Sequence, residues 1–384
     1  MPKKIVNYKD LLEHHLHVLK NLQYESGLFA ASKKDSSTGY NKSWLRDNFY
    51  EALAFEVIGD YVTIRKTYKA LLKTFLKHEY KIDHAIAVKP KHRYQYIHAR
   101  YHPETFDEFW DEWGNKQNDV IGAILFGIGK LEKDKVKIVE SADEKRIVQK
   151  LVWYLSTLEY WHDKDSGMWE EDEEVHSSSI GACVAGLEMI KSARGITVPQ
   201  KLIVKGYETL AGQLPRESKK KFVDLALLSL IWPYNVVDEK QKHEILENVE
   251  YHLLKKRGVI RYKNDYYYNK NEDKYSEEAE WTFGLSWLAI IYGKMADEES
   301  KSKTDEKNKT KRERKSKEKI SEEYMTKAKK FEKLALETIT HEGTLPELYF
   351  SNSPKHNENN PLGWSESLFI VSLHDINMKH AKMK

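Results

Sequence analysis

The sequence predicts an all-α fold, and three observations support this prediction. Turn-forming residues are scarce, with 18 glycines and 9 prolines among 384 residues, well below the roughly 12% that these two types contribute on average. Apolar residues recur with helical spacing along most of the chain. The alternation typical of a half-buried strand occurs only in short pieces such as Gly258–Tyr268.

The apolar repeats place the helices in order. The first predicted helix has Leu11, Leu12, His15, Leu19 and Leu22 on one face. Residues 120–130 are apolar nearly all round, as expected of a fully buried helix. Further helices, making eleven or twelve in total, are predicted over residues 49–58, 61–76, 147–158, 180–190, 199–212, 221–231, 239–255, 277–294, 322–340 and 363–374.

Long loops rich in aromatic and charged residues separate many of these helices. Loops of such length are usually functional or disordered, and their aromatic residues favour order because disordered segments avoid them. Their recurrence after every second helix suggests a ring of helical hairpins, an (α/α)6 toroid, although a helical bundle or solenoid fits the periodicity equally well. The loops are Tyr24–Ser43, Glu79–Lys116, His162–His176, Arg257–Ser276 and Glu342–Pro361.

Charge and cysteine content favour a soluble protein without a nucleic-acid partner. Residues 300–319 hold ten Lys/Arg and four Asp/Glu, so the rest of the chain carries −3 of the net +3, unlike a domain with a basic binding face. Because Cys183 is the only cysteine, an internal disulfide is excluded. We expect a cytoplasmic protein with no membrane segment, and a single domain over residues 1–384 that contains a solvated or partly disordered charged insertion at 294–322.

Several loops combine a carboxylate, often an arginine, with a tryptophan or tyrosine. A pyranose needs this mixture, because its apolar face stacks on an aromatic ring while its hydroxyls bind charged groups through strong hydrogen bonds. Cleavage of a glycosidic bond then requires two carboxyl groups, one protonated and one ionised. The motifs are Trp44–Asn48, Trp113–Asp119, Gly167–Glu171, Gly258–Tyr262, Glu278–Trp281 and Leu345–Tyr349.

These motifs resemble those of glycoside hydrolase family 15, the glucoamylase family, and of its relatives at the N-terminus of phosphorylase kinase regulatory subunits. The resemblance covers about residues 25–375 and implies an (α/α)6 barrel with the active site at one end. It also implies hydrolysis without a cofactor or metal. The matching segments, in the family's order, are Gly27–Ser32 with Thr38–Tyr40, Trp44–Asn48, Trp113-Gly114 with Gln117–Asp119, Gly167–Glu170, Ser177–Gly186, Arg261-Tyr262 with Glu280-Trp281, and Pro346–Leu348 with Pro361–Trp364.

The resemblance also implies roles for individual residues. Glu170 resembles the general acid that protonates the leaving oxygen, and Glu347 resembles the general base that activates water. Arg46 and Asp47 would bind the O4 and O6 hydroxyls of the terminal glucose. The other predicted sugar-binding residues are Trp44 beside that glucose, Trp113 near the scissile bond, Arg261 and Trp281 at the next sugar, and Asp119, Trp169 and Glu171 from the same motifs.

Elementary chemistry agrees with the two carboxylate roles. Burial against an indole and neighbouring negative charge would raise the pKa of Glu170. A base roughly 6.5–9.5 Å from the acid leaves room for water and inverts the anomeric centre. The expected enzyme is an inverting exo-acting α-glycosidase for short α-glucans or related α-glucosides.

Alternatives remain open at several positions. The five acids at 170–174 would also suit a solvated acidic loop, and Glu342, Glu358 and Glu366 compete with Glu347 for the base. Glu366 lies inside an apolar helix, where a capping or core-edge role is favoured. Like the kinase subunits, the chain would alternatively be a carbohydrate-binding or regulatory module without turnover, since a fold does not guarantee the chemistry.

Other motifs carry less chemistry. The histidines form no HExxH pattern, and we expect no metal site. Ser177–Ser179 precede a predicted helix and are interpreted as its N-cap. Cys183 lies on an apolar helical face and is interpreted as a core residue.

Overall fold

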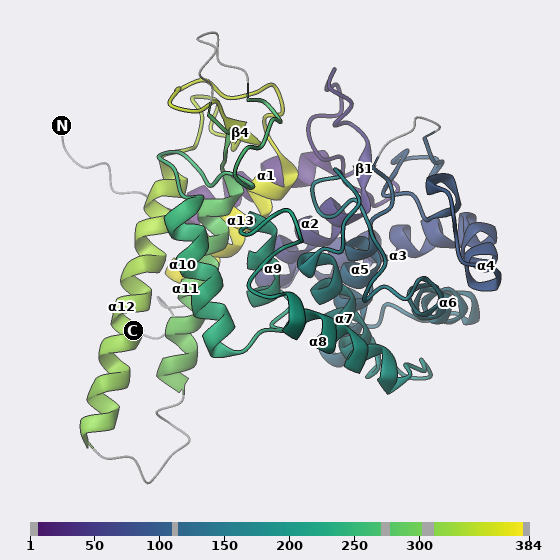
Figure 1. Cartoon of the computed structure of the whole chain (residues 1–384). Coiled ribbons are helices and arrows are strands. Elements are labelled where there is room, and N and C mark those ends of the chain that lie inside the picture. Colours follow the sequence, from purple (N-terminus) through teal and green to yellow (C-terminus); the bar gives the residue numbers. More distant parts are fainter. Residues whose placement is uncertain (1–6, 110–113, 270–276, 302–310, 379–384) are drawn as a thin grey trace. The chain divides into compact units, whose positions relative to one another are not determined.

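The computed structural model describes residues 7–109, 114–269, 277–301 and 311–378, with the side chains of 311–314 and 378 left out. Helices dominate this part of the chain, as the sequence predicts (Figure 1). The α-helices are α1 Tyr8–Leu22, α2 Leu45–Ile58, α3 Tyr61–Lys77, α4 Glu79–Ala87, α5 Asn118–Lys133, α6 Ala142–Leu158, α7 Ser177–Ile190, α8 Gln200–Gln213, α9 Leu228–Ile231, α10 Glu239–His252, α11 Phe283–Lys301, α12 Lys311–Leu336 and α13 Gly363–Leu373.

Shorter elements connect these helices. Single 3-10 turns occur at Arg93–Gln95 (η1) and Leu225–Leu227 (η2), and a π-helical turn, His374–Met378 (η3), follows α13. Two antiparallel two-stranded ladders pair β1 with β2 and β3 with β4. The strands are β1 Ser43–Trp44, β2 Arg100–Tyr101, β3 Glu280–Trp281 and β4 Leu348–Tyr349.

The chain folds into two compact units. The central unit comprises residues 22–253 and 261–263, and the terminal unit comprises residues 1–21, 254–260 and 264–384. The single domain expected over residues 1–384 therefore stays a prediction.

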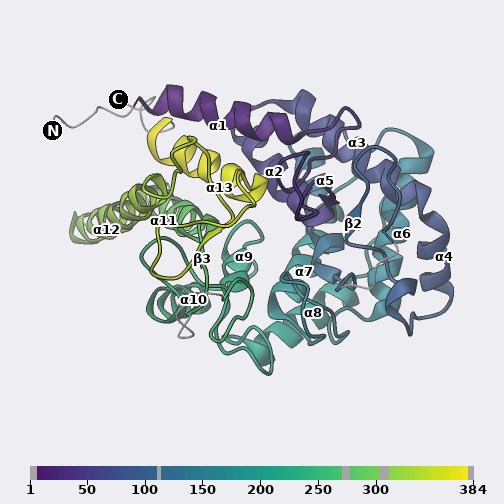
Figure 2. The ribbon, with the colours of Figure 1, turned by 90° about the horizontal axis from the view of Figure 1, so that it is seen from above.

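In the central unit, α5 packs closely along α7 (Figure 2). Glycines allow this approach: a Cβ on Gly122 or on Gly186 would overlap the backbone of the facing helix. Around this pair, α2 packs on α3 and α5, α7 packs on α8, and α4 packs on α6. The apolar segment 120–130 is thus the buried helix that its composition predicts.

In the terminal unit, α11 packs on α12 and α13. The rings of Phe283 and Trp364 stack 4.6 Å apart, and those of Tyr292 and Phe331 stack 5.8 Å apart. These pairs attach both neighbours to α11. The charged segment expected to be an insertion continues α11 to Lys301 and begins α12 at Lys311, while residues 302–310 lie outside the described part.

Three helix predictions differ from the structure. Residues 79–87 form α4 although they were expected in a loop, because ion pairs from Glu79 to Arg146 and Lys150 fasten a helix that buries only Ile82 and Ala85. Residues 221–231 form only η2 and the four-residue α9, which ends just before Pro233. Residues 277–282 are not helical, since Glu280 and Trp281 pair with β4 instead.

No helix in the described ranges is long and apolar enough to span a membrane.

Candidate active site

The Trp44–Asn48 motif turns from a strand into a helix in the central unit. Trp44 is extended and directly precedes α2, so Arg46 and Asp47 lie in its first turn. Asn48 fastens this turn, because its side-chain amide donates to the Trp44 carbonyl (2.7 Å) and its Oδ1 accepts the Phe29 amide (2.9 Å). The motif therefore presents Arg46 and Asp47 from a rigid helix N-terminus.

Arg46 lies at the centre of a buried ion-pair cluster. Its side chain is 4% exposed; Nε donates to Asp119 Oδ2 at 2.8 Å, and Nη1 lies 3.4 Å from Glu170 Oε1. Nη2 donates to the Gln117 side-chain carbonyl. Although burial acts in the opposite direction, Asp119 and Glu170 raise the pKa of Arg46, so the guanidinium stays charged.

Glu170 has a backbone conformation that is unusual for a residue with a side chain. Its φ is +65°, in the left-handed region. Gly114 lies against its backbone, where any Cβ would overlap the Glu170 carbonyl. A strained backbone of this kind persists only where the surrounding structure over-determines it, and such sites cluster at functional positions.

The Glu170 carboxyl has the properties of a proton donor. Its side chain is 16% exposed, so solvent or a ligand can reach it. Burial raises its pKa to about 8, and the charge of Asp47 adds to this effect, while Arg46 opposes it. A carboxyl with this pKa carries its proton at neutral pH, as an acid catalyst requires.

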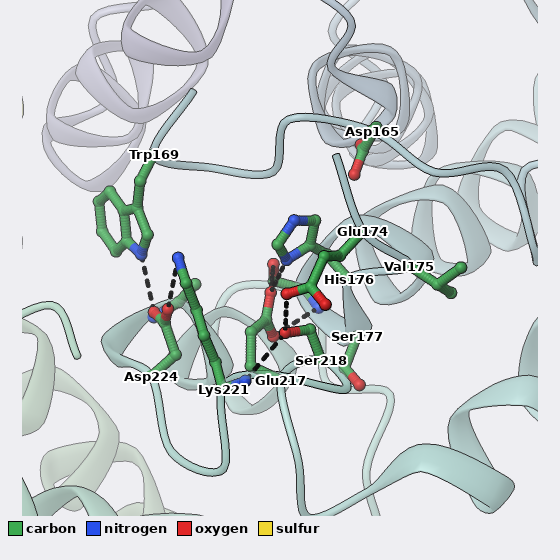
Figure 3. Close-up of polar contacts among 12 residues, drawn as sticks. Asp165, Trp169, Glu174, Val175, His176, Ser177, Glu217, Ser218, Lys221 and Asp224 are labelled. Atoms are coloured by element: carbon green, nitrogen blue, oxygen red, sulfur yellow. Dashed lines mark hydrogen bonds and ion pairs between the residues drawn. The ribbon is translucent and has the colours of Figure 1, made fainter. Parts of the chain in front are cut away.

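The two neighbours of Glu170 are held by different partners. The Trp169 indole donates to Asp224 Oδ1 at 2.7 Å, as Figure 3 shows. Glu171 accepts from Arg261 at 2.9 Å and from the Tyr262 hydroxyl at 2.6 Å. Lys221 also lies 2.9 Å from Glu171. Glu171 is thus an ion-paired residue, not a member of a solvated acidic loop.

In the terminal unit, Glu347 is buried beside two asparagines. The residue is 1% exposed, and Oε2 accepts from Asn357 at 2.5 Å and Asn359 at 2.7 Å. The Glu347 amide donates to the Asn359 carbonyl (2.9 Å), and its carbonyl accepts the Thr282 amide (3.2 Å). Backbone and side chain are therefore fixed together.

Trp281 and Glu366 also lie in the terminal unit. Trp281 is in β3, with its ring 5.8 Å from that of Tyr267. Glu366 is fully buried on α13, where it binds His15 Nδ1 at 2.5 Å and accepts the Leu345 amide at 2.7 Å. Its carboxyl oxygens therefore fasten the segment that leads to Glu347, which agrees with a core role.

The central unit brings together most of the residues predicted for the site. Arg46, Asp119 and Glu170 form one cluster, while Glu171 and Arg261 form the adjoining pair. Trp44 and Asp47 come from the turn that carries Arg46, and Trp169 precedes Glu170. Glu347 and Trp281 belong to the terminal unit, and Trp113 lies outside the described residues.

Sequence reasoning missed the supporting residues. Asp224, Lys221, Asn357 and Asn359 were not proposed, although the last two stand in a conspicuous Asn-Glu-Asn-Asn run. The N-cap prediction for Ser177–Ser179 was wrong: these serines form the first turn of α7, where the carboxylate of Glu217 accepts the Ser178 amide (3.0 Å). A carboxylate from another loop can satisfy a helix N-terminus as well as a local cap can.

Within the described part of the chain, no group of three or more His, Cys, Asp and Glu side chains is arranged to hold a metal ion.

The model of glycosyl hydrolases family 15 matches residues 6–274 of the chain. The chain belongs to glycosyl hydrolase family 15. The matched range contains the Arg46–Glu170 cluster but not Glu347. Solved structures extend the similarity: a wild-type glycosidase has a TM-score of 0.77 at 16% identity, with 97% of each chain covered. A glucoamylase from Saccharomycopsis fibuligera has a TM-score of 0.72 at 16% identity, covering 97% of this chain and 95% of that one. These similarities confirm the predicted all-α fold of the (α/α)6 class.

The curated relatives of this family-15 chain are named as regulatory subunits of a kinase and not as glycosidases. A probable phosphorylase b kinase regulatory subunit alpha from Drosophila melanogaster is 26% identical over 77% of the chain. The corresponding subunit from Caenorhabditis elegans is 30% identical over 48%. The family-15 chain spans only 27% and 18% of the length of these two relatives.

Proposed function

We propose that this family-15 chain is an inverting, exo-acting α-glycosidase. It would hydrolyse terminal α-linked glucose from short α-glucans or related α-glucosides, as part of polysaccharide metabolism. Glu170 is the general acid and Glu347 the general base. The single, buried Cys183 suits a cytoplasmic location.

The observation that carries this proposal is the state of Glu170. Its carboxyl has a pKa raised to about 8 by burial, yet the side chain is still 16% exposed beside Arg46. A buried structural carboxylate paired with arginine would have a lowered pKa and no access to a ligand. A carboxyl that is both protonated and reachable suits proton donation to a leaving oxygen.

The remaining residues support sugar binding. Arg46 and Asp47 would bind the O4 and O6 hydroxyls of the terminal glucose, with Trp44 beside them and Asp119 holding Arg46 through a 2.8 Å contact. Arg261 and Trp281 would contact the neighbouring sugar, and Trp113 would line the site near the scissile bond. Trp169 and Glu171 are further sugar-binding candidates. A variant of a structurally similar glycosidase is described in complex with glucose, which favours the same ligand class here.

The test is proton NMR of the purified chain with maltotriose, isomaltose and trehalose in parallel, followed from the first minutes. We expect β-glucose to appear before mutarotation from at least one substrate, which also ranks the linkages. If α-glucose appears first, the inverting mechanism is wrong.

A second candidate function is a carbohydrate-binding or regulatory module without turnover. It is favoured by the names of the curated relatives, which are regulatory subunits of phosphorylase b kinase. Binding of an oligosaccharide that remains uncleaved after long incubation would establish this alternative.

A further inference from the structure

The segment that carries Glu170 is a loop closed at its base. Asp165 and Glu174 pair as an antiparallel bridge, and we call residues 165–174 the acid loop. Within it, Glu170 adopts a φ of +65°, which is unfavourable for a residue with a Cβ. The direction of its carboxyl therefore depends on the contacts that hold its two neighbours.

Asp224 is the hydrogen-bond acceptor that holds the Trp169 indole in place. Its side chain is fully buried, and Oδ1 accepts both the Trp169 indole (2.7 Å) and the Ala226 amide (2.8 Å), so the carboxylate is anchored by its own turn. Figure 3 shows the indole pointing directly at this carboxylate. The guanidinium of Arg261 lies over the Trp169 ring, 5.4 Å from its centroid.

The same backbone also holds the residue after Glu170. Asp224 pairs with Tyr262 as an antiparallel bridge, and the Leu225 amide donates to the Arg261 carbonyl at 2.7 Å. Arg261 and Tyr262 in turn bind Glu171. One short backbone pairing therefore supplies the acceptor for Trp169 and the donors for Glu171, on either side of the strained residue.

We propose that Asp224 is a positioning residue for the general acid. By accepting a hydrogen bond from the Trp169 indole, it holds the acid loop so that Glu170 points its carboxyl toward the glycosidic oxygen. This inference rests on the proposed function. Asp224 would act through Trp169 and not by contact with substrate, while its second oxygen lies 3.7 Å from Lys221.

Four variants separate this role from a purely structural one. Asp224→Ala removes the acceptor, whereas Asp224→Asn keeps an Oδ1 that can accept the hydrogen bonds of both the Trp169 indole and the Ala226 amide. Trp169→Phe removes the indole donor and keeps a ring under Arg261. Asp172→Ala is the matched control, since it deletes an acidic side chain of the same loop that is 82% exposed and pairs only with Lys220 among the contacts described.

We expect Asp224→Ala and Trp169→Phe each to lower kcat about 10- to 100-fold with KM changed less than threefold, because a small misplacement of a reacting group costs about this much. The double variant, Asp224→Ala with Trp169→Phe, should have a kcat no lower than that of either single variant, since both substitutions break the same contact. Asp224→Asn and Asp172→Ala should stay within about fivefold of wild type.

A second readout follows the titration of Glu170. A loosened acid loop admits water, so the pKa of Glu170, measured by carbon NMR of its carboxyl, should fall in Asp224→Ala and stay near the wild-type value in Asp224→Asn. A protein that was merely less stable would not shift this titration. All variants are compared at temperatures where circular dichroism reports them folded.

The possible results distinguish a failure of this inference from a failure of the proposed function. The inference is overturned if Asp224→Ala keeps both wild-type kcat and the wild-type Glu170 titration, or if Asp224→Asn is as impaired as Asp224→Ala. If wild type cleaves none of the test sugars, the proposed function fails, and the Glu170 titration in Asp224→Ala then decides by itself whether Asp224 positions this carboxyl.

Discussion

Glu170 combines a left-handed backbone with a carboxyl whose pKa is raised to about 8. Because a general acid works only while protonated, hydrolysis should fall as the pH rises through about 8. Glu170→Gln should lower kcat by roughly 10²–10⁴-fold, the usual contribution of a general acid. Initial rates of maltotriose cleavage between pH 5 and 9 measure both effects.

Glu173→Gln is the control for this prediction. Glu173 belongs to the same acidic run but is paired with Arg93 at 2.7 Å, and its side chain is 28% exposed. Its replacement should leave the rate and the pH profile nearly unchanged. Full turnover in Glu170→Gln would contradict the assignment of the acid.

Glu51 on α2 is another buried carboxyl, and neither of its oxygens has a hydrogen-bond partner among the described residues. Burial raises its pKa well above 4.5, and the charge of Asp47 adds to this. The folded chain therefore keeps a proton that the unfolded chain releases, so this group lowers stability progressively as the pH rises above about 4.5.

Glu51→Met should stabilise the chain by about 1–3 kcal/mol at pH 8, because it replaces an unpaired buried carboxyl with an apolar side chain of similar size. The gain should shrink near pH 5. Urea unfolding at the two pH values measures the difference. Glu51→Gln is the control: it abolishes this pH dependence without removing the polar group, and a destabilised Glu51→Met at pH 8 would contradict the account.

Among the helices, the α5–α7 contact depends on residues without side chains. A Cβ on Gly122 would overlap the backbone of Ala182 and Cys183, whereas one on Gly212, in α8, would meet nothing within 4 Å. Gly122→Ala must push two buried helices apart and should destabilise the chain by about 1–3 kcal/mol.

Gly212→Ala tests the opposite sign, because alanine is favoured over glycine in a helix by roughly 0.5–1 kcal/mol. Thermal unfolding of both variants should therefore move in opposite directions. An equal rise in the melting temperature of both variants would show that helix propensity, and not close packing, controls the response at Gly122.

Element prediction succeeded where apolar faces were wide. Segments 61–76 and 120–130 match α3 and α5 within a few residues because burial imposes their periodicity. It failed at α4, whose two buried residues leave a weak apolar signal and whose Glu79 pairs with Arg146, 67 positions away. It also failed at residues 277–282, because the pairing partner of β3 lies in another loop.

At the scale of the whole molecule, the net charge of +3 depends on a lysine-rich segment that the proposed chemistry does not use. Lys319 on α12 is 80% exposed and lies 3.8 Å from its ion-pair partner Glu323. Lys315 on the same helix is also exposed. Replacing both lysines with glutamine should leave turnover within twofold and stability within about 0.5 kcal/mol.

Lys221→Gln is the contrasting variant, since Lys221 is only 14% exposed and pairs with Glu171 beside the acid. It should reduce kcat/KM for maltotriose by about tenfold or more. Comparable losses in the Lys315 and Lys319 variant would show that the charged segment takes part in the reaction.

By itself the sequence determined the all-α class, most helices and the motifs of the candidate site, because local periodicity and the chemistry of sugar recognition are written in neighbouring residues. Its order of motifs also pointed to the family. Only the tertiary structure decided that Asp224 binds Trp169, that Glu217 caps α7, and that Asn357 and Asn359 hold Glu347. The physical reason is that such partners meet through backbone pairings and buried hydrogen bonds between separate loops, which no local pattern encodes.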